Sequence, residues 1–177
     1  MKPHPATGAD GAAASDRYPM PGGEWYILDM EILQQFMAYA AAFEQTLVDD
    51  DWTRLRPFFA ADAVYEVQSE DVGCRLVGPE AIFAGMKKSL NGFDRRFETR
   101  DVAVTSPPVV DGDEMRIGWT VTYGKAGVAP LPLRGRSTVR YRDGVIGQLT
   151  DAFDPAMERE LADWQRANAL PVDVSYT

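Results

Sequence analysis

Histidine is nearly absent from this chain of 177 residues. The only one, His4, lies in an N-terminal stretch rich in proline, glycine and alanine. Serine–histidine–aspartate triads, cysteine–histidine pairs and histidine-ligated zinc sites all need a histidine in the folded part of a protein. We therefore expect none of these sites, and any acid–base chemistry has to use aspartate, glutamate, tyrosine, lysine or water.

Cysteine, long apolar runs and positive charge are also scarce. Cys74 is the single cysteine, so no internal disulfide can form, which is typical of a reducing compartment. No apolar run has the length of a membrane span, and the N-terminus lacks the apolar core of a signal peptide. The 18 basic and 27 acidic side chains leave a net charge of −9, which disfavours nucleic acid and anionic lipid as partners. We predict a cytoplasmic protein that binds neither nucleic acid nor membranes.

The length fits one domain with a sizeable core. We predict a flexible extension over residues 1–23, a folded domain over 24–168 and a C-terminal tail over 169–177. The first stretch has almost nothing apolar to bury, but the segment from Trp25 to Leu28 interrupts that pattern. This segment is either a short strand or helix lead-in, or an arm that docks on the domain or on a partner subunit.

Apolar residues at spacings of three and four predict four helices. The acidic run Asp49–Asp51 ends the first of them, and no further ligand follows at the spacing of an EF-hand calcium loop. We therefore assign it to a turn between helices and predict no metal site. The predicted helices are one from Met30 with Asp29 as N-cap, a short one over 52–58, one over 78–90, and one from Pro155 with Asp154 as N-cap.

Alternating apolar residues predict strands in the rest of the chain. One of them stops at Ser106-Pro107-Pro108, and an Asp143-Gly144 hairpin joins the last two. Helices on one side of an antiparallel sheet make an α+β domain, and a strongly bent sheet closed by the first long helix would enclose a pocket. The predicted strands cover residues 63–68, 97–105, 115–123, 133–142 and 145–153.

Asp151 is the carboxylate with the strongest claim to a functional role. It shares one face of its strand with Leu149 and Phe153, so it points where apolar side chains point. Burial raises the pKa of a carboxylate, which helps a general base to work near neutral pH. The alternative is that Asp151 pairs with an arginine or caps a backbone turn, because ion-pair networks also hold buried acids.

Four arginines alternate on one face of a predicted strand: Arg134, Arg136, Arg140 and Arg142. Such a row could bind an anionic ligand. We favour a solvated or subunit-facing outer surface instead.

Several phrases of the sequence, in this order, resemble the NTF2-like superfamily, and specifically its SnoaL-like proteins. They are YAAAFEQ, RPFFAADAVYEV, GPEAI and YRDGVIGQLTDAFD, and the resemblance spans residues 31–155. It implies a cone-shaped α+β barrel, in which a curved antiparallel sheet wraps around a long N-terminal helix and encloses an internal cavity. It also implies a homodimer, a small apolar molecule in the cavity and no cofactor.

The resemblance to individual enzymes of the superfamily is uneven. Val67 stands where ketosteroid isomerase has its catalytic Asp, so we do not expect that isomerase mechanism; the second Asp position of that enzyme falls near Ser137. Asp151 matches the water-activating Asp of limonene epoxide hydrolase and Tyr65 matches one of its two orienting residues. Val67 replaces the other, an Asn, and Trp119 and Val121 replace the arginine and the acid. A SnoaL-type polyketide cyclase needs fewer partners, because its substrate already carries an acidic proton.

We therefore predict a protein that binds a small, mainly apolar ligand and acts through acid–base chemistry, of cyclase, isomerase, dehydratase or hydrolase type. Asp151 is the predicted general base and Tyr65 its orienting partner. The alternative is a non-catalytic module for ligand binding or dimerisation. The residues predicted to bind the ligand are Phe36, Tyr39, Val67, Phe83, Met86, Trp119, Val121, Tyr123 and Ser137.

Overall fold

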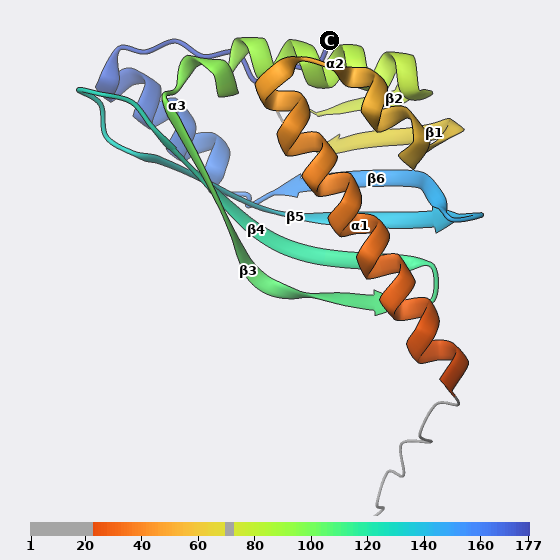
Figure 1. Cartoon of the computed structure of the whole chain (residues 1–177). Helices are drawn as coiled ribbons and strands as arrows, with labels where there is room; N and C mark the ends of the chain where they lie inside the picture. Colours follow the sequence, from red (N-terminus) through yellow and green to blue (C-terminus); the bar gives the residue numbers. More distant parts are fainter. Residues whose placement is uncertain (1–22, 70–72) are drawn as a thin grey trace, which may run out of the picture.

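The computed structural model describes residues 23–69 and 73–177 (Figure 1), with only the backbone described for 23–28. The extension predicted over residues 1–23 therefore lies outside the described residues, apart from Gly23. The elements are α1 (Gly23–Asp49), the 3₁₀ helix η1 (Trp52–Phe58), β1 (Phe59–Gln68), β2 (Cys74–Val77), α2 (Pro79–Gly92), the 3₁₀ helix η2 (Asp94–Arg96), β3 (Thr99–Asp111), β4 (Glu114–Gly124), β5 (Leu131–Arg142), β6 (Val145–Phe153) and α3 (Met157–Asn168).

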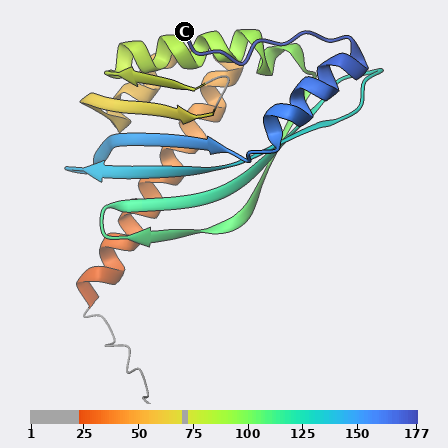
Figure 2. The same ribbon diagram turned by 180° about the vertical axis from the view of Figure 1, so that it is seen from behind.

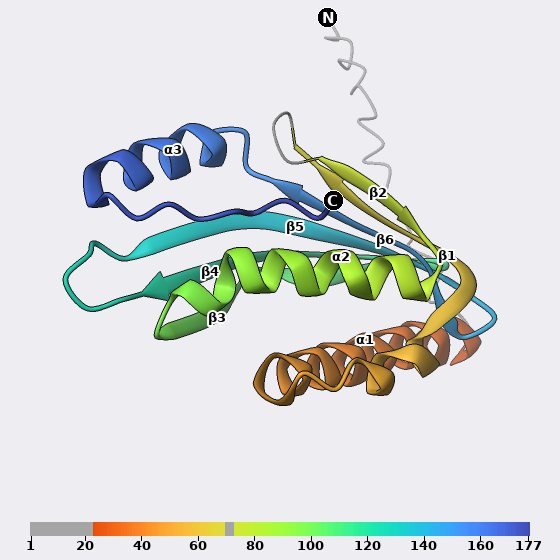
Figure 3. The ribbon, with the colours of Figure 1, turned by 90° about the horizontal axis from the view of Figure 1, so that it is seen from above.

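A single curved sheet of six strands, in the order β2-β1-β6-β5-β4-β3, organises the molecule. All neighbouring strands are antiparallel except β1 and β6, which run parallel. Helix α1 crosses one face of the sheet, as Figures 1 and 2 show from opposite sides, and α3 lies at one end of it (Figure 3). The predicted α+β fold with a curved sheet is confirmed. The sheet stays open, with β2 and β3 as its edges.

The side chains between α1, α2 and the sheet form an aromatic and aliphatic core. Tyr39 of α1 is edge-on to Phe58 and Phe59, with ring centroids 6.0 and 5.5 Å away. On the sheet side, β4 and β5 bury alternate residues such as Met115 and Val139, as expected for strands with one face on a core. Among the described residues, no helix is long and apolar enough to cross a membrane.

Two predicted helix starts were wrong. Helix α1 begins at Gly23, so Asp29 lies inside the helix and is not its N-cap, and the segment from Trp25 to Leu28 is the helix lead-in. Helix α3 begins only at Met157. Asp154 accepts a hydrogen bond from the Ala156 amide at 2.9 Å, so its side chain holds the turn before the helix and leaves the helix itself without a side-chain cap.

The predicted end of the third strand was also wrong. Strand β3 continues through Ser106-Pro107-Pro108 to Asp111. Proline lacks the amide that a central strand needs, but β3 is an edge strand, where that amide can face solvent. The register against β4 shifts on both sides of Ser106, and such irregularities are common at sheet edges. In addition, β1 begins four residues before the predicted Ala63, and no strand was predicted at the position of β2.

The predicted hairpin between the last two strands is confirmed. Asp143 and Gly144 have φ angles of 53° and 76°, and a two-residue hairpin turn of this type requires positive φ at both positions.

The arginine row on β5 lies on the outer face of the sheet. Three of its members pair with acids of the same chain: Arg134 with Glu160, Arg140 with Glu114, and Arg142 with Asp62.

The segment after α3, over residues 169–177, packs along α2. The Asp173 amide donates to the Gly92 carbonyl at 3.1 Å, and Lys88 donates to Ser175 at 2.7 Å. A Cβ atom at Gly92 would lie only 2.4 Å from the Asp173 oxygen. The missing side chain of Gly92 therefore lets the C-terminal backbone approach the helix closely.

Gly92→Ala should push the C-terminal segment away from α2. Overpacking costs about 1–3 kcal/mol, which exceeds the gain of up to about 1 kcal/mol that alanine brings to a helix. We expect faster amide exchange at residues 170–177 and a lower free energy of unfolding. Gly147→Ala is the matched control, because a Cβ there makes only ordinary contacts at 3.5 Å or more. Unchanged exchange in Gly92→Ala would show that the segment is not held by this contact.

Candidate functional site

A cavity of about 350 Å³ lies between α1, α2 and the sheet. Its wall is mainly apolar, and its volume is in the range of small-molecule sites. Met37 of α1 and Val102 and Val104 of β3 line it and are 58%, 51% and 61% exposed. Because these three residues reach both the cavity and solvent, the cavity opens between α1 and the edge strand β3.

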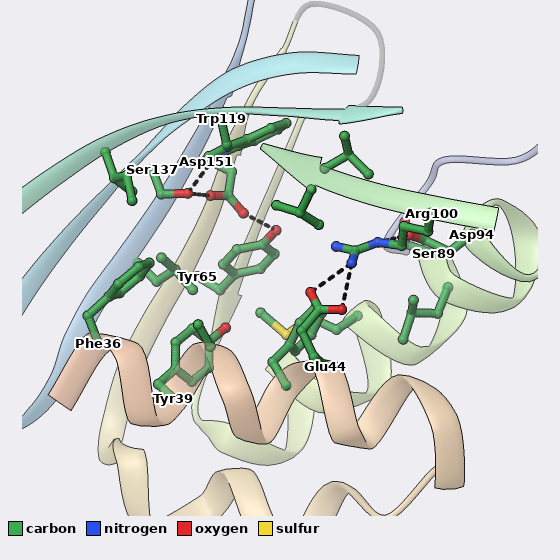
Figure 4. Close-up of a pocket in the computed structure, with 18 of the residues that line it drawn as sticks. Phe36, Tyr39, Glu44, Tyr65, Ser89, Asp94, Arg100, Trp119, Ser137 and Asp151 are labelled. Carbon is green, nitrogen blue, oxygen red and sulfur yellow. Dashed lines mark hydrogen bonds and ion pairs between the residues drawn. The ribbon is translucent and has the colours of Figure 1, made fainter. Parts of the chain in front are cut away.

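The cavity holds a hydrogen-bonded chain of four side chains, centred on Asp151 (Figure 4). Tyr65 Oη donates to Asp151 Oδ2 at 2.8 Å, and Ser137 Oγ donates to Asp151 Oδ1 at 2.5 Å. Trp119 Nε1 donates to Ser137 Oγ at 2.9 Å. An indole N–H can only donate, so Ser137 accepts from Trp119 and has its own hydrogen available for Asp151.

Strand pairing explains why these side chains meet. Asp151 of β6 is directly opposite Ser137 of β5 and pairs with Val67 on β1. Tyr65 lies two residues before Val67, so it shares a strand face with it. Trp119 comes from β4, which pairs with β5 on its other side. The sheet register thus brings side chains of β1 and β5 to the Asp151 carboxyl group, and Trp119 of β4 joins them through Ser137.

The surroundings of Asp151 favour its protonated form. Burial raises the pKa of Asp151, while the hydrogen bonds from Ser137 and Tyr65 oppose the rise in part. Among the described residues, no arginine or lysine pairs with it. The alternative of an Asp151–arginine pair is therefore not what the structure shows; two neutral hydroxyl groups hold the carboxyl. Burial, and next the Asp151 charge, also raise the pKa of Tyr65.

Tyr176 is a site residue that the sequence analysis missed. Its hydroxyl lies 3.4 Å from that of Tyr65, and the two ring centroids are 5.6 Å apart. It also lines the cavity. Tyr176 belongs to the C-terminal segment, which has no helical or strand pattern, so no periodic signal in the sequence could place it.

A charged cluster at another part of the cavity wall was missed as well. Arg100 Nη1 donates to both carboxylate oxygens of Glu44, at 2.7 and 2.8 Å. Arg100 Nε lies 3.3 Å from Asp94 Oδ1, which also accepts a 2.7 Å hydrogen bond from Tyr123. Burial raises the pKa of Asp94, against the opposing effects of Tyr123 and Arg100. The cluster joins α1, η2, β3 and β4, and no local motif predicts such a meeting.

Most of the predicted ligand-binding residues line the cavity, namely Phe36, Tyr39, Met86, Trp119, Val121 and Ser137, together with Asp151 and Tyr65. Three do not. Val67 is 3% exposed and belongs to the core. Phe83 is buried in the same core as Val67, with its ring 5.5 Å from that of Phe59.

Tyr123 is the third predicted residue outside the wall. Its ring packs against Phe93 and Phe97, with centroids 4.9 Å away in both cases, and its hydroxyl donates a hydrogen bond to Asp94.

Within residues 23–69 and 73–177, no group of three or more His, Cys, Asp or Glu side chains is arranged to hold a metal ion.

Comparison with known proteins gives a family and a fold. A family model described as SnoaL-like domain matches residues 38–148, whereas no curated protein matches the sequence. A putative SnoaL-like polyketide cyclase from Jannaschia sp. CCS1 superposes with a TM-score of 0.58 at 16% identity, covering 80% of this chain and 94% of that one.

Two further solved structures are similar at the same level. An NTF2-like protein of unknown function from Burkholderia pseudomallei K96243 has a TM-score of 0.59 at 15% identity, with coverage of 74% of this chain and 96% of that one. TerC, co-crystallised with polyporic acid, has a TM-score of 0.56 at 18% identity, with coverage of 75% and 98%. At such identities the likeness concerns the fold alone.

The raised pKa of Asp151 makes a prediction about stability. The pKa of Asp151 is higher in the folded than in the unfolded protein. Its contribution to the free energy of unfolding is therefore fully present below the unfolded pKa of about 3.9, and it is lost as pH rises through the folded pKa. Asp151→Asn has no charge to bury, so its melting temperature should rise relative to wild type between pH 4 and pH 8. Asp154→Asn, at an exposed carboxylate, is the control. A growing loss of stability in Asp151→Asn over that range would contradict the burial argument.

Proposed function

Because the chain belongs to the SnoaL-like domain family, we propose that it binds a small, mainly apolar molecule in the cavity and that Asp151 transfers a proton on it. The matched residues 38–148 include most of the cavity wall. The observation that carries the proposal is a carboxyl with a raised pKa inside a mainly apolar cavity that opens to solvent. A raised pKa brings a carboxyl group closer to the range in which a general base works best.

The hydrogen bonds around Asp151 suit this role. Ser137 and Tyr65 each contact a different carboxylate oxygen, which fixes the orientation of the group while leaving further lone pairs for a substrate proton. In the proposed step, Asp151 takes a proton from a carbon next to a carbonyl group and returns it at a second position. The substrate supplies the acidity, so the step needs no cofactor.

The residues that replace the partners of other superfamily enzymes support this choice. Val67 is apolar and buried where the resemblance to ketosteroid isomerase would need an aspartate. Trp119 occupies a position where the resemblance to epoxide hydrolase would need a charged residue, and its indole holds Ser137. Two of the similar structures carry names that fit an oxygenated apolar ligand, a putative polyketide cyclase and a complex with polyporic acid.

A non-catalytic binding module is the second candidate. The observation in its favour is that two hydroxyl groups already satisfy Asp151, as expected for a buried polar group with a structural role. Both candidates use the same cavity, and they differ only in whether Asp151 exchanges a proton with the ligand.

Deuterium exchange into 2-tetralone, a small apolar ketone with an acidic carbon, distinguishes the two. We expect the protein to accelerate exchange in heavy water, followed by NMR, and Asp151→Asn to lose about 100-fold or more of that acceleration. Tyr65→Phe should lose about tenfold, because it removes one hydrogen bond to the carboxylate. The Asp154→Asn variant should exchange the ketone as fast as wild type.

The result against catalysis is equally clear. If 2-tetralone binds to wild type and to Asp151→Asn but exchanges at the buffer rate with both, Asp151 is structural and the binding module remains. If the ketone exchanges equally fast with both proteins, another group is the base.

A further inference from the structure

Arg100 has one terminal nitrogen that the protein leaves without a partner. Nη1 binds Glu44 and Nε lies beside Asp94, but Nη2 donates no hydrogen bond to any residue that the structure describes. In Figure 4 this nitrogen carries no dashed line and points into the pocket. Arg100 itself lies across the pocket from Asp151 and Ser137. The Arg100 side chain is 21% exposed and lines the cavity.

The free N–H groups of Nη2 donate only to what fills the cavity. Nη2 is accessible to solvent, whereas Arg100 Nε is buried and has no hydrogen-bond partner among the described residues. Val102, Val121 and Leu90 line the same cavity with apolar side chains. A ligand that displaces water from Nη2 therefore has to offer it an acceptor, because otherwise the donor loses its hydrogen bond.

The charges around Arg100 restrict what that acceptor is. A guanidinium only donates, so the partner has to be an oxygen or nitrogen with a lone pair. Glu44 and Asp94 already supply two carboxylates against one guanidinium. A third anion at this point would be repelled, which favours an uncharged oxygen such as that of a ketone, ester or ether.

We infer that Arg100 is a ligand-binding residue that holds a neutral carbonyl or ether oxygen at the side of the cavity away from Asp151. This inference rests on the proposed binding of a small molecule and adds the class of that molecule. The ligand has an apolar middle and two polar ends, one within reach of Asp151 and the other bound to Arg100. Glu44 and Asp94 hold the guanidinium in place from two sides, so it is oriented before the ligand arrives.

Two probes of the same shape test this inference. 9-Fluorenone carries one carbonyl group, and fluorene has a CH₂ group in its place. Equilibrium dialysis should show that the wild-type protein binds fluorenone about tenfold or more tightly than fluorene, as expected for one hydrogen bond from a charged donor. In Arg100→Met this preference should fall to about one, because methionine keeps apolar bulk and has no donor.

Arg134→Met is the matched control. Arg134 also binds both oxygens of one glutamate, at 2.7 and 2.8 Å, but it lies on the outer face of the sheet, away from the cavity. Its variant should keep the wild-type preference. Arg100→Lys is a second variant that keeps a positive charge against Glu44 and Asp94, so it should fold even if the methionine variant does not. Its single nitrogen cannot stay between the two carboxylates and also occupy the position of Nη2, so it should also lose the preference.

The outcomes separate this inference from the function it rests on. If fluorenone and fluorene bind equally to wild type, or if Arg100→Met and Arg100→Lys keep the wild-type preference, Arg100 does not bind the oxygen and the inference is wrong, while cavity binding stands. If neither probe binds to wild type, the cavity does not admit a small apolar molecule, and both proposals are overturned.

Discussion

The carboxyl group of Asp151, held between the hydroxyls of Tyr65 and Ser137, is the interaction on which the site depends. It exists because β6 lies between β1 and β5, so a residue on the central strand receives one hydroxyl from each side. The curvature of the sheet and the crossing helix α1 surround this group with apolar side chains. The same arrangement raises its pKa, since desolvation outweighs two hydrogen bonds. A buried carboxyl group with a raised pKa costs the folded protein stability as pH rises through that pKa.

The cavity has polar groups on two sides and apolar groups between them. On one side lie Asp151 and its neutral partners, and on the other Arg100 with two carboxylates. The two sides differ in charge balance: Asp151 has no cation beside it among the described residues, whereas Asp94 does. Burial raises the pKa of both carboxyl groups, and only at Asp94 does an arginine oppose the rise. We therefore propose proton transfer for the Asp151 side and ligand recognition for the Arg100 side, within a family whose members share a fold more than a reaction.

Local signals in the sequence predicted local structure well. The alternation over 145–153 and the Asp-Gly turn before it predicted β6, and this strand brings Asp151 into the cavity wall. The two prolines after Ser106 predicted a strand end, yet β3 continues through them because it is an edge strand. The sequence could not show this, since whether a strand lies at the edge depends on its neighbours in the sheet. Tyr176 and Arg100 could not be predicted, since they reach the cavity only through the packing of α2 and the pairing of β3 with β4. Tyr123 and Phe83 are aromatic residues of the type that lines apolar cavities, but both pack elsewhere. The Tyr123 hydroxyl binds Asp94 and the Phe83 ring packs on Phe59, and neither contact can be predicted from local sequence.

The protonation of Asp151 is the central claim, and it can be measured directly. The carbon-13 shift of the Asp151 side-chain carboxyl, followed by NMR over pH 2 to 9 and assigned with Asp151→Asn, gives its pKa in the folded protein. We expect a value clearly above the ordinary aspartate value of about 3.9, because burial is the largest influence on it. A value at or below about 3.9 would contradict a raised pKa. Asp151 would then be an ordinary ionised carboxylate fixed by hydrogen bonds, with no special capacity to take up a proton near neutral pH.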